Sequence, residues 1–170
     1  LDAVDESLSK SSINFKDWTS IIRAAFINTV DEMVNITAHP NVDPFYFVKY
    51  ISNLKPDIYV AGSSGGCAEV SFLNFKIAKN QVFVNSPGLG SMGFGVPSIV
   101  GATEGNPNAS IICVVGDGGL QMNIQELATI SRYSRRKILL AVFNNNGYGI
   151  IKQFQGLYLN KRYEATISTK

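Results

Sequence analysis

The alternation of short apolar runs with amphipathic stretches constrains the fold of this chain most strongly. Four runs are rich in apolar, largely β-branched residues, and longer stretches between them repeat apolar residues at helical spacing. The runs are "DIYVAG" (57–62), "QVFVN" (81–85), "SIICVVGD" (110–117) and "KILLAVFNN" (137–145). Apolar strands that alternate with helices are typical of a parallel sheet buried on both faces. The sequence therefore predicts an α/β fold, a doubly wound parallel sheet with helices on both faces.

The stretches between these runs predict the helices. We expect helices over residues 45–54, 67–78, 91–105 and 120–134, and a further helix that starts within 147–155. Residues 17–34 also show helical spacing, but "NITAHPNVDP" (35–44) follows with two prolines and reads as a linker. We predict that residues 1–40 are a remnant of a preceding region and that residues 41–170 form most of one α/β domain.

Composition narrows the class of protein. Only 16% of the residues are charged, the net charge is +2, and the longest basic run, "RRK" at 135–137, is typical of a solvated helix end, so we expect no nucleic-acid partner. The single histidine, His39, and the two cysteines, Cys67 and Cys113, have no zinc-site spacing. The cysteines are expected to be free thiols in a reducing, cytoplasmic compartment. No apolar run is long enough to span a membrane. The missing initial Met and the abrupt end at "YEATISTK" predict a piece of a longer protein.

Small and polar residues follow all four predicted strands. Ligands of open parallel sheets bind outside the carboxyl ends of the strands, so these four positions are candidate site segments. They are Gly62-Ser63-Ser64, Asn85-Ser86-Pro87-Gly88, Gly116-Asp117-Gly118-Gly119 and Asn144-Asn145-Asn146-Gly147.

Asp117 and Asn145 form the most informative pair. They are 28 positions apart, which is about the length of a helix, a loop and a return strand, so a crossover would bring both to one sheet edge. A carboxylate and an amide oxygen suit Mg²⁺, which prefers one or two protein groups together with substrate phosphates. Gly118 and Gly119 would let backbone N–H groups approach a phosphate at a helix start. The pattern favours a Mg²⁺–diphosphate site.

Two other interpretations remain open from the residues alone. Asp-Gly and Asn-Gly are also common turn sequences, and each by itself has little diagnostic value. Gly88, Gly90 and Gly93 match the spacing of a dinucleotide-binding loop, but no acidic residue stands at the ribose-binding distance after them. A dinucleotide site is therefore the weaker interpretation.

Three longer stretches resemble thiamine-diphosphate (ThDP) enzymes, and in particular the large subunit of acetolactate synthase. They are "SPGLGSMGFGVPSIVGA" (86–102), "GDGGLQMNIQELATI" (116–130) and "NNNGYGIIKQFQ" (144–155). Residues 17–54 are also similar to that family's lead from its middle domain into its C-terminal cofactor domain. The resemblance implies a ThDP-binding fold, incomplete at its C-terminal end, with residues 1–40 as a remnant of the middle domain and linker.

The resemblance also implies roles for individual residues. Asp117 and Asn145 would ligate Mg²⁺ through their side chains and Gly147 through its carbonyl. Gly118 and Gly119, with the turn at Gly62, Ser63 and Ser64, would hold the diphosphate. Met92 would be the apolar wedge that bends ThDP, and Gly90 would accept a hydrogen bond from its aminopyrimidine. Without this context, Met92 would be interpreted as an ordinary core methionine.

Departures from the family bear on the reaction. Related decarboxylases carry a glutamate six residues beyond the metal-binding asparagine, where this chain has Ile151, so the resemblance favours carboligation over aldehyde release. Phe154 stands where acetolactate synthases have a tryptophan that shapes the acceptor pocket, and Ser63-Ser64 replace a Gln-His pair. The acceptor could therefore be pyruvate, 2-ketobutyrate or a larger 2-keto acid.

The resemblance implies a transferase of branched-chain amino acid biosynthesis that decarboxylates pyruvate and joins the two-carbon unit to a second 2-keto acid. No catalytic residue is expected in this chain, because the family's activating glutamate comes from the pyrimidine domain of a partner subunit. The chain alone is expected to be inactive, and its parent protein is expected to be a homodimer or tetramer. Whether the parent protein binds FAD is left open. The alternatives are a 2-keto-acid decarboxylase-like protein, a subunit of a split ThDP enzyme, or a non-catalytic phosphate-binding module.

Overall fold

We describe the protein from a computed structural model. The structure describes Ser20 and residues 42–62, 64–133 and 137–166. The chain divides into two units, Leu1–Thr37 and Ala38–Lys170, and all described residues except Ser20 lie in the second. The remnant expected at residues 1–40 lies almost wholly outside the described residues. That assignment and the boundary at residue 41 therefore stay predictions.

The four apolar runs form one parallel sheet. The strands are β1 (Ile58–Ala61), β2 (Val82–Val84), β3 (Ile111–Gly116) and β4 (Ile138–Phe143), and their order in the sheet is β2-β1-β3-β4. Ile111 of β3 pairs with Ile58 of β1 on one side and with Ile138 of β4 on the other. Each strand lies within the run predicted for it, and the predicted α/β class is confirmed.

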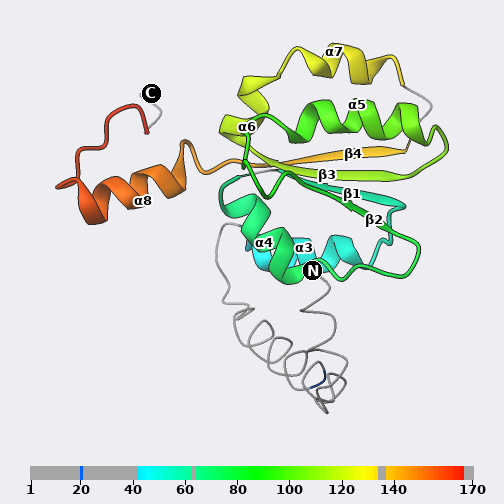
Figure 1. The fold of residues 1–170 in the computed structure, drawn as a ribbon, viewed down its shortest axis with the longest axis horizontal. Helices are drawn as coiled ribbons and strands as arrows, with labels where there is room; N and C mark the ends of the chain where they lie inside the picture. The colour runs from blue at the N-terminus through cyan, green and yellow to red at the C-terminus, as the bar shows by residue number, and fades with distance from the viewer. Residues whose placement is uncertain (1–19, 21–41, 63, 134–136, 167–170) are drawn as a thin grey trace, which may run out of the picture. The chain divides into compact units, whose positions relative to one another are not determined.

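Helices cover both faces of the sheet, as a doubly wound fold requires (Figure 1). Two lie on one face, α3 (Pro44–Ser52) and α4 (Gly66–Asn74), and two on the other, α5 (Gly95–Gly105) and α7 (Glu126–Ser131). Of the other helices in the described ranges, α6 (Asp117–Met122) directly follows β3, and α8 (Gly149–Tyr158) begins after the turn that follows β4. α3 begins where Asp43 accepts hydrogen bonds from the N–H groups of Phe45 and Tyr46.

The prediction of one continuous helix over residues 120–134 is wrong. The chain leaves helical geometry at Asn123, which has φ −135° and ψ 39°, and α6 and α7 lie on either side of the break. The side-chain Nδ2 group of Asn123 donates a hydrogen bond to the Gly93 carbonyl oxygen at 2.9 Å. Because this bond reaches a segment 30 positions away, helical spacing alone cannot reveal it.

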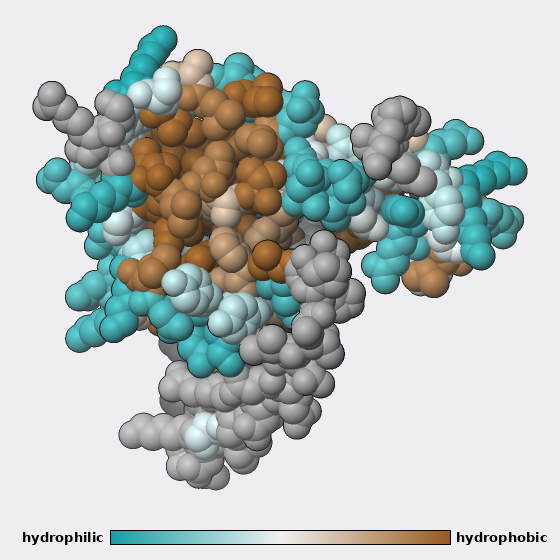
Figure 2. All heavy atoms as spheres, turned by 180° about the vertical axis from the view of Figure 1, so that it is seen from behind, coloured by the Kyte–Doolittle hydropathy of each residue, from teal (hydrophilic) through white to brown (hydrophobic). Residues whose placement is uncertain are grey.

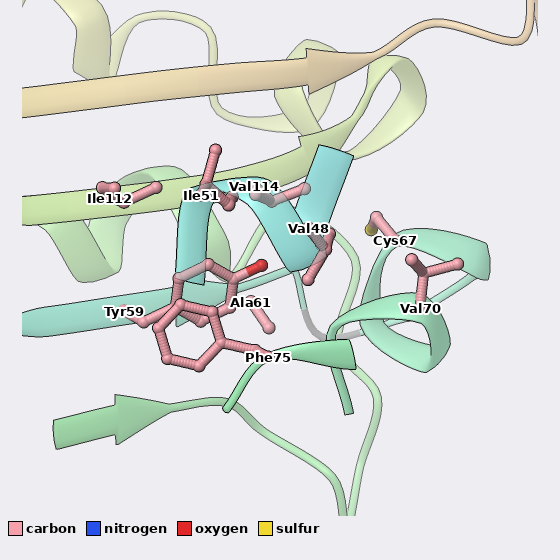
Figure 3. Packing of buried hydrophobic residues seen from close by; sticks show 9 residues of the cluster. All are labelled: Val48, Ile51, Tyr59, Ala61, Cys67, Val70, Phe75, Ile112 and Val114. Atoms are coloured by element: carbon pink, nitrogen blue, oxygen red, sulfur yellow. The ribbon is translucent and has the colours of Figure 1, made fainter. Parts of the chain in front are cut away.

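Two apolar clusters pack on the two faces of the sheet. Tyr59 and Ala61 of β1 point to the face of α3 and α4, whereas Ile58 and Val60 belong to the cluster against α5. β3 alternates in the same way. Figure 3 shows the first cluster, where Val48 and Ile51 of α3 and Cys67 and Val70 of α4 gather over the strands. Burial of both faces explains why the central strands are apolar throughout.

The Tyr59 side chain is the largest one in this core. It is fully buried, and its ring stacks on Phe75 with centroids 3.8 Å apart. Its hydroxyl group is 2.8 Å from the hydroxyl oxygen of Ser71, so the buried polar atom has a hydrogen-bond partner. Burial raises the pKa of the Tyr59 phenol, which therefore stays protonated at neutral pH.

A contiguous apolar patch, bordered by hydrophilic residues, lies on the face of the molecule shown in Figure 2. β4 is the last strand of the described sheet, and its Leu139 and Val142 side chains are 44% and 38% exposed. Ile124 and Leu127, between α6 and the end of α7, are exposed as well. An apolar area of this kind is typical of a surface that another segment or subunit covers.

Close packing of α5 against the sheet depends on Gly95. A Cβ added at Gly95 would lie 2.5 Å from Cγ1 of Val115 and 3.6 Å from Cα of Gly62, whereas one at Gly101 on the same helix would meet nothing within 4 Å. Gly95 stands at the start of α5, next to the segment that carries Gly90 and Met92. The missing side chain therefore sets how closely this segment approaches the ends of β1 and β3.

The two glycines of α5 give a matched test. Gly95→Ala is expected to lower the free energy of unfolding by about 1–3 kcal/mol, because the added methyl group overpacks the contact with Val115. Gly101→Ala is expected to raise it by about 0.4–1 kcal/mol, because alanine reduces the entropy of the unfolded chain. Urea unfolding followed by circular dichroism measures both changes. A Gly95→Ala variant as stable as the parent protein would contradict this packing.

Candidate functional site

The order of the strands places a crevice between β1 and β3. From β1 the chain moves to β2 at one side, and from β2 it crosses to β3 on the other side of β1. The crevice at such a reversal, outside the carboxyl ends of the strands, is where open α/β sheets bind ligands. β1 and β3 run parallel, with Ala61 opposite Val114, so the turns that follow them lie at the same edge.

A cavity of about 1260 Å³ occupies this edge. Its wall includes the turns after β1, β3 and β4, the start of α4 and the loop before α5. Most of the predicted site residues line it, namely Gly62, Ser64, Gly90, Met92, Asp117, Gly118, Gly119, Asn145, Gly147 and Ile151. The fold thus brings together residues that are up to 89 positions apart in the sequence.

Two predicted residues stand apart from this group. Ser63 lies outside the described residues. Phe154 is not among the residues that line the cavity; its side chain is 52% exposed, and its ring centroid lies 4.8 Å from that of Tyr158. In this structure, α8 therefore directs Ile151 but not Phe154 to the cavity.

The predicted metal-binding residues belong to two turns that touch. Asp117 is the first residue of α6, directly after β3, and the N–H group of Gly147 donates to its Oδ2 atom at 3.0 Å. The turn after β4 is held by an internal bond from the Asn146 N–H group to Oδ1 of Asn144, at 2.9 Å. Asn146 has a φ of +60°, which asparagine tolerates better than most residues. The Asn145 side chain lies against Gly149, where an added Cβ would be 2.7 Å from Nδ2.

Asn85 holds the turn after β1 from the neighbouring strand. Its Nδ2 group donates to the carbonyl oxygens of Ala61 and Gly62, at 3.1 and 3.0 Å. Its Oδ1 atom is buried and has no hydrogen-bond partner among the described residues. Asn85 was singled out in the sequence only as part of a polar strand end, and its role as a brace between β2 and β1 depends on the parallel pairing.

Cys67 lines the cavity with a buried thiol. Burial raises the pKa of its thiol, so the unreactive protonated form predominates at neutral pH. Its Sγ atom lies 3.4 Å from the Ser64 carbonyl oxygen, and a Cβ added at Gly62 would be only 2.8 Å from the sulfur. Cys67 therefore packs under the turn after β1.

The charged side chains around the cavity are acidic. Among the described residues, the charged side chains that line it are Asp117 and Glu69, and no lysine, arginine or histidine does. An anionic ligand at this wall therefore needs a cation or backbone N–H groups to balance its charge. The described residues contain no cluster of three His, Cys, Asp or Glu side chains, so a metal here would also require amide or backbone oxygens.

Glu69 and Tyr148 also line the cavity, and neither was predicted from the sequence. Glu69 stands in the first turn of α4, and Tyr148 follows the predicted ligand Gly147 directly. The only sequence signal for Tyr148 is its place between two glycines in "NNNGYG", because its neighbours in space come from the turn after β3.

Comparison with known proteins assigns the family. Residues 64–169 match the family described as thiamine pyrophosphate enzyme, C-terminal TPP binding domain. The acetolactate synthase large subunit of Buchnera aphidicola is 37% identical over 128 residues, which cover 75% of this chain and 22% of that protein. Isozyme 2 of the same subunit in Escherichia coli is 34% identical over 135 residues, which cover 77% of this chain and 24% of that protein. This chain thus spans less than a quarter of the length of these relatives.

A solved structure supports the fold. The ThDP-dependent 4-hydroxybenzoylformate decarboxylase of Rhodococcus jostii superposes with a TM-score of 0.64, covering 79% of this chain and 26% of that one. The two share 19% sequence identity, so the similarity bears on the fold alone. With the family match over residues 64–169, it follows that this chain belongs to the thiamine pyrophosphate (ThDP) enzymes and carries their C-terminal cofactor-binding domain.

Proposed function

We propose that the cavity at the carboxyl ends of β1 and β3 holds the diphosphate of ThDP through Mg²⁺, in an acetolactate-synthase-like carboligase. The parent enzyme would decarboxylate pyruvate and join the two-carbon unit to a second 2-keto acid. The hydrogen bond from the Gly147 N–H group to Asp117 carries this proposal, because it joins the carboxylate to the turn that contains Asn145 and Gly147, and all three residues line the cavity.

The residues present fit a magnesium ion. The Asp117 carboxylate, the Asn145 amide oxygen and the Gly147 carbonyl are hard oxygen ligands of the kind that Mg²⁺ prefers. The wall lacks basic side chains among the residues described, so a metal ion supplies the positive charge that a diphosphate needs. Gly118 and Gly119 lie at the start of α6 on the same wall, where their N–H groups are available to phosphate oxygens.

The loop before α5 is proposed to hold the rest of the cofactor. Gly90 has a φ of +58°, a conformation that favours glycine, and Met92 lines the cavity with a partly exposed side chain. We assign Met92 as the apolar support of the bent cofactor and the Gly90 carbonyl as an acceptor for its amino group. When bound, ThDP supplies an electron sink for decarboxylation, and the protein supplies orientation and electrostatics.

The activating carboxylate is proposed to come from a partner subunit. The two carboxylates on the described cavity wall are Asp117, which is assigned to the metal, and Glu69 in α4. The exposed apolar surface at β4 supports the proposal of a homo-oligomeric parent.

The two buried free cysteines, Cys67 and Cys113, support a reducing, cytoplasmic compartment. No helix in the described ranges is both long and apolar enough to cross a membrane.

The metal assignment is tested with Asp117→Asn, which keeps the shape of the side chain and removes its charge. In the full-length protein, we expect ThDP binding to require Mg²⁺, and the variant to bind ThDP at least about tenfold more weakly, or about 1.4 kcal/mol. Isothermal titration calorimetry with and without Mg²⁺ measures both effects.

Asp57→Asn serves as the matched control for this test. Asp57 precedes β1, at the opposite end of the sheet from the cavity, where its Oδ2 atom accepts from the N–H and hydroxyl groups of Ser110. We expect the Asp57→Asn variant to bind ThDP with the same affinity as the parent protein. Tight, metal-independent binding by Asp117→Asn would refute the metal assignment.

Ile151 is expected to limit the release of aldehyde. An apolar side chain at this wall can neither hold nor deliver a proton, so the two-carbon unit is expected to add to a second keto acid. With pyruvate as the substrate of the full-length protein, acetaldehyde should be a minor product beside acetolactate. Ile151→Glu should raise the acetaldehyde fraction, and gas chromatography of both products measures the ratio.

Leu157→Glu controls for a new carboxylate on the same helix. Leu157 is exposed and is not among the residues that line the cavity, so this variant should keep the product ratio of the parent. Acetaldehyde as the main product of the parent protein would refute the role assigned to Ile151.

A further inference from the structure

We infer that Tyr148 is a positioning residue for the proposed metal site, and that its aromatic ring holds the turn after β4 against the turn after β3. This inference rests on the proposed function, because it concerns the residues assigned to the metal. Tyr148 itself is not placed among the ligands. It acts through its neighbours, Gly147 on one side and Gly118 across the cavity wall.

The ring of Tyr148 lies directly against Gly118. A Cβ added at Gly118 would clash with Cε1 of this ring and would lie 2.9 Å from Cδ1 and 3.4 Å from Cζ. These are the three nearest atoms, so the space beside Gly118 is filled by Tyr148. Glycine at position 118 therefore leaves room for the ring as well as for a phosphate, and an alanine there would have to displace it.

This ring contact adds to the hydrogen bond between Gly147 and Asp117. Residues 147 and 148 of one turn contact residues 117 and 118 of the other, through the 3.0 Å bond from the Gly147 N–H group and through the ring. One contact alone would hold the turn after β4 against the turn after β3 at a single point. Two adjacent contacts fix both the separation and the orientation of the turns, and they thereby position the Asn145 side chain and the Gly147 carbonyl.

The segment after α8 secures Tyr148 from its other side. The Tyr148 N–H group donates to the carbonyl oxygen of Thr166 at 3.3 Å, and Thr166 is 4% exposed. The Thr166 hydroxyl donates to Oε1 of Gln155 in α8 at 2.9 Å. Thr166 thus connects the backbone at Tyr148 to α8.

The ring, and not the hydroxyl group, is the part of Tyr148 that makes this contact. The three atoms nearest to a Cβ added at Gly118 are all ring carbons of Tyr148. Tyr148→Phe should therefore preserve the effect, and Tyr148→Ala should remove it. This difference separates positioning by packing from a role in proton transfer.

The test compares Tyr148→Phe and Tyr148→Ala in the full-length protein. The readouts are Mn²⁺ binding by electron paramagnetic resonance at saturating ThDP and the Mg²⁺ concentration that half-saturates ThDP binding by calorimetry. Tyr148→Ala should weaken metal binding on the order of 10–100-fold, as is typical when the support of a metal ligand is lost. Tyr148→Phe should match the parent protein, and the melting temperature of the metal-free Tyr148→Ala protein should change little.

A double-mutant cycle with Gly118→Ala tests the contact itself. Gly118→Ala should weaken Mn²⁺ binding, because the added methyl group pushes the ring away. Adding Tyr148→Ala removes the clash, so the double variant should bind Mn²⁺ no more weakly than Gly118→Ala alone. Additive losses in the double variant would show that the two residues do not act through one contact, and would overturn the inference.

The outcomes separate this inference from the proposed function. If the parent protein binds ThDP with Mg²⁺ and Tyr148→Ala has an unchanged metal requirement, the inference alone is wrong. If Tyr148→Ala lowers only the melting temperature, or Tyr148→Phe loses metal binding equally, positioning by the ring is also refuted. If the parent shows no metal-dependent ThDP binding while Asp117→Asn is likewise without effect, the proposed function fails and the inference falls with it.

Discussion

The parallel pairing of β1 with β3 is the constraint on which the rest of this structure depends. It buries both strands between two layers of helices, so their side chains alternate between the cluster of Tyr59 and the cluster of Ile111. Because the strands are parallel, it also places the turns at Gly62 and Asp117 at one edge. The buried core and the candidate site therefore depend on the same register, and a slip of one residue would exchange the two faces and disrupt both.

Close approach at glycines connects this register to the site. Gly62 leaves room for the sulfur of Cys67, Gly95 for Val115, and Gly118 for the ring of Tyr148. Each contact joins the end of a strand to a neighbouring segment that lines the cavity. The glycines around the cavity thus serve packing as well as the backbone access to phosphate that the sequence predicts. The two uses are compatible, because both require the absence of a side chain.

The sequence predicts the strands well because buried parallel strands are apolar throughout, as in the run that became Ile111–Gly116. It also predicts that Asp117 and Asn145 share an edge, because a right-handed crossover leaves few alternatives, and both residues line the cavity. It cannot predict contacts made across the fold, such as the side-chain bond from Asn123 to Gly93 at the break in the predicted helix, or the packing of Tyr148 on Gly118. The position of Phe154 away from the cavity likewise depends on the direction of α8, which local spacing does not determine.

In the proposed site, the charge around the cavity would make the binding of metal and diphosphate interdependent. The described wall holds the carboxylates of Asp117 and Glu69 and no basic side chain, so a diphosphate alone would meet net repulsion there. A divalent cation alone would keep open coordination positions, which water or phosphate oxygens must fill. Each ligand supplies what the other lacks, and linkage requires that each raise the affinity of the other by the same factor. If a lysine side chain lined this wall, the coupling would be weaker, because the lysine would bind the diphosphate without the metal.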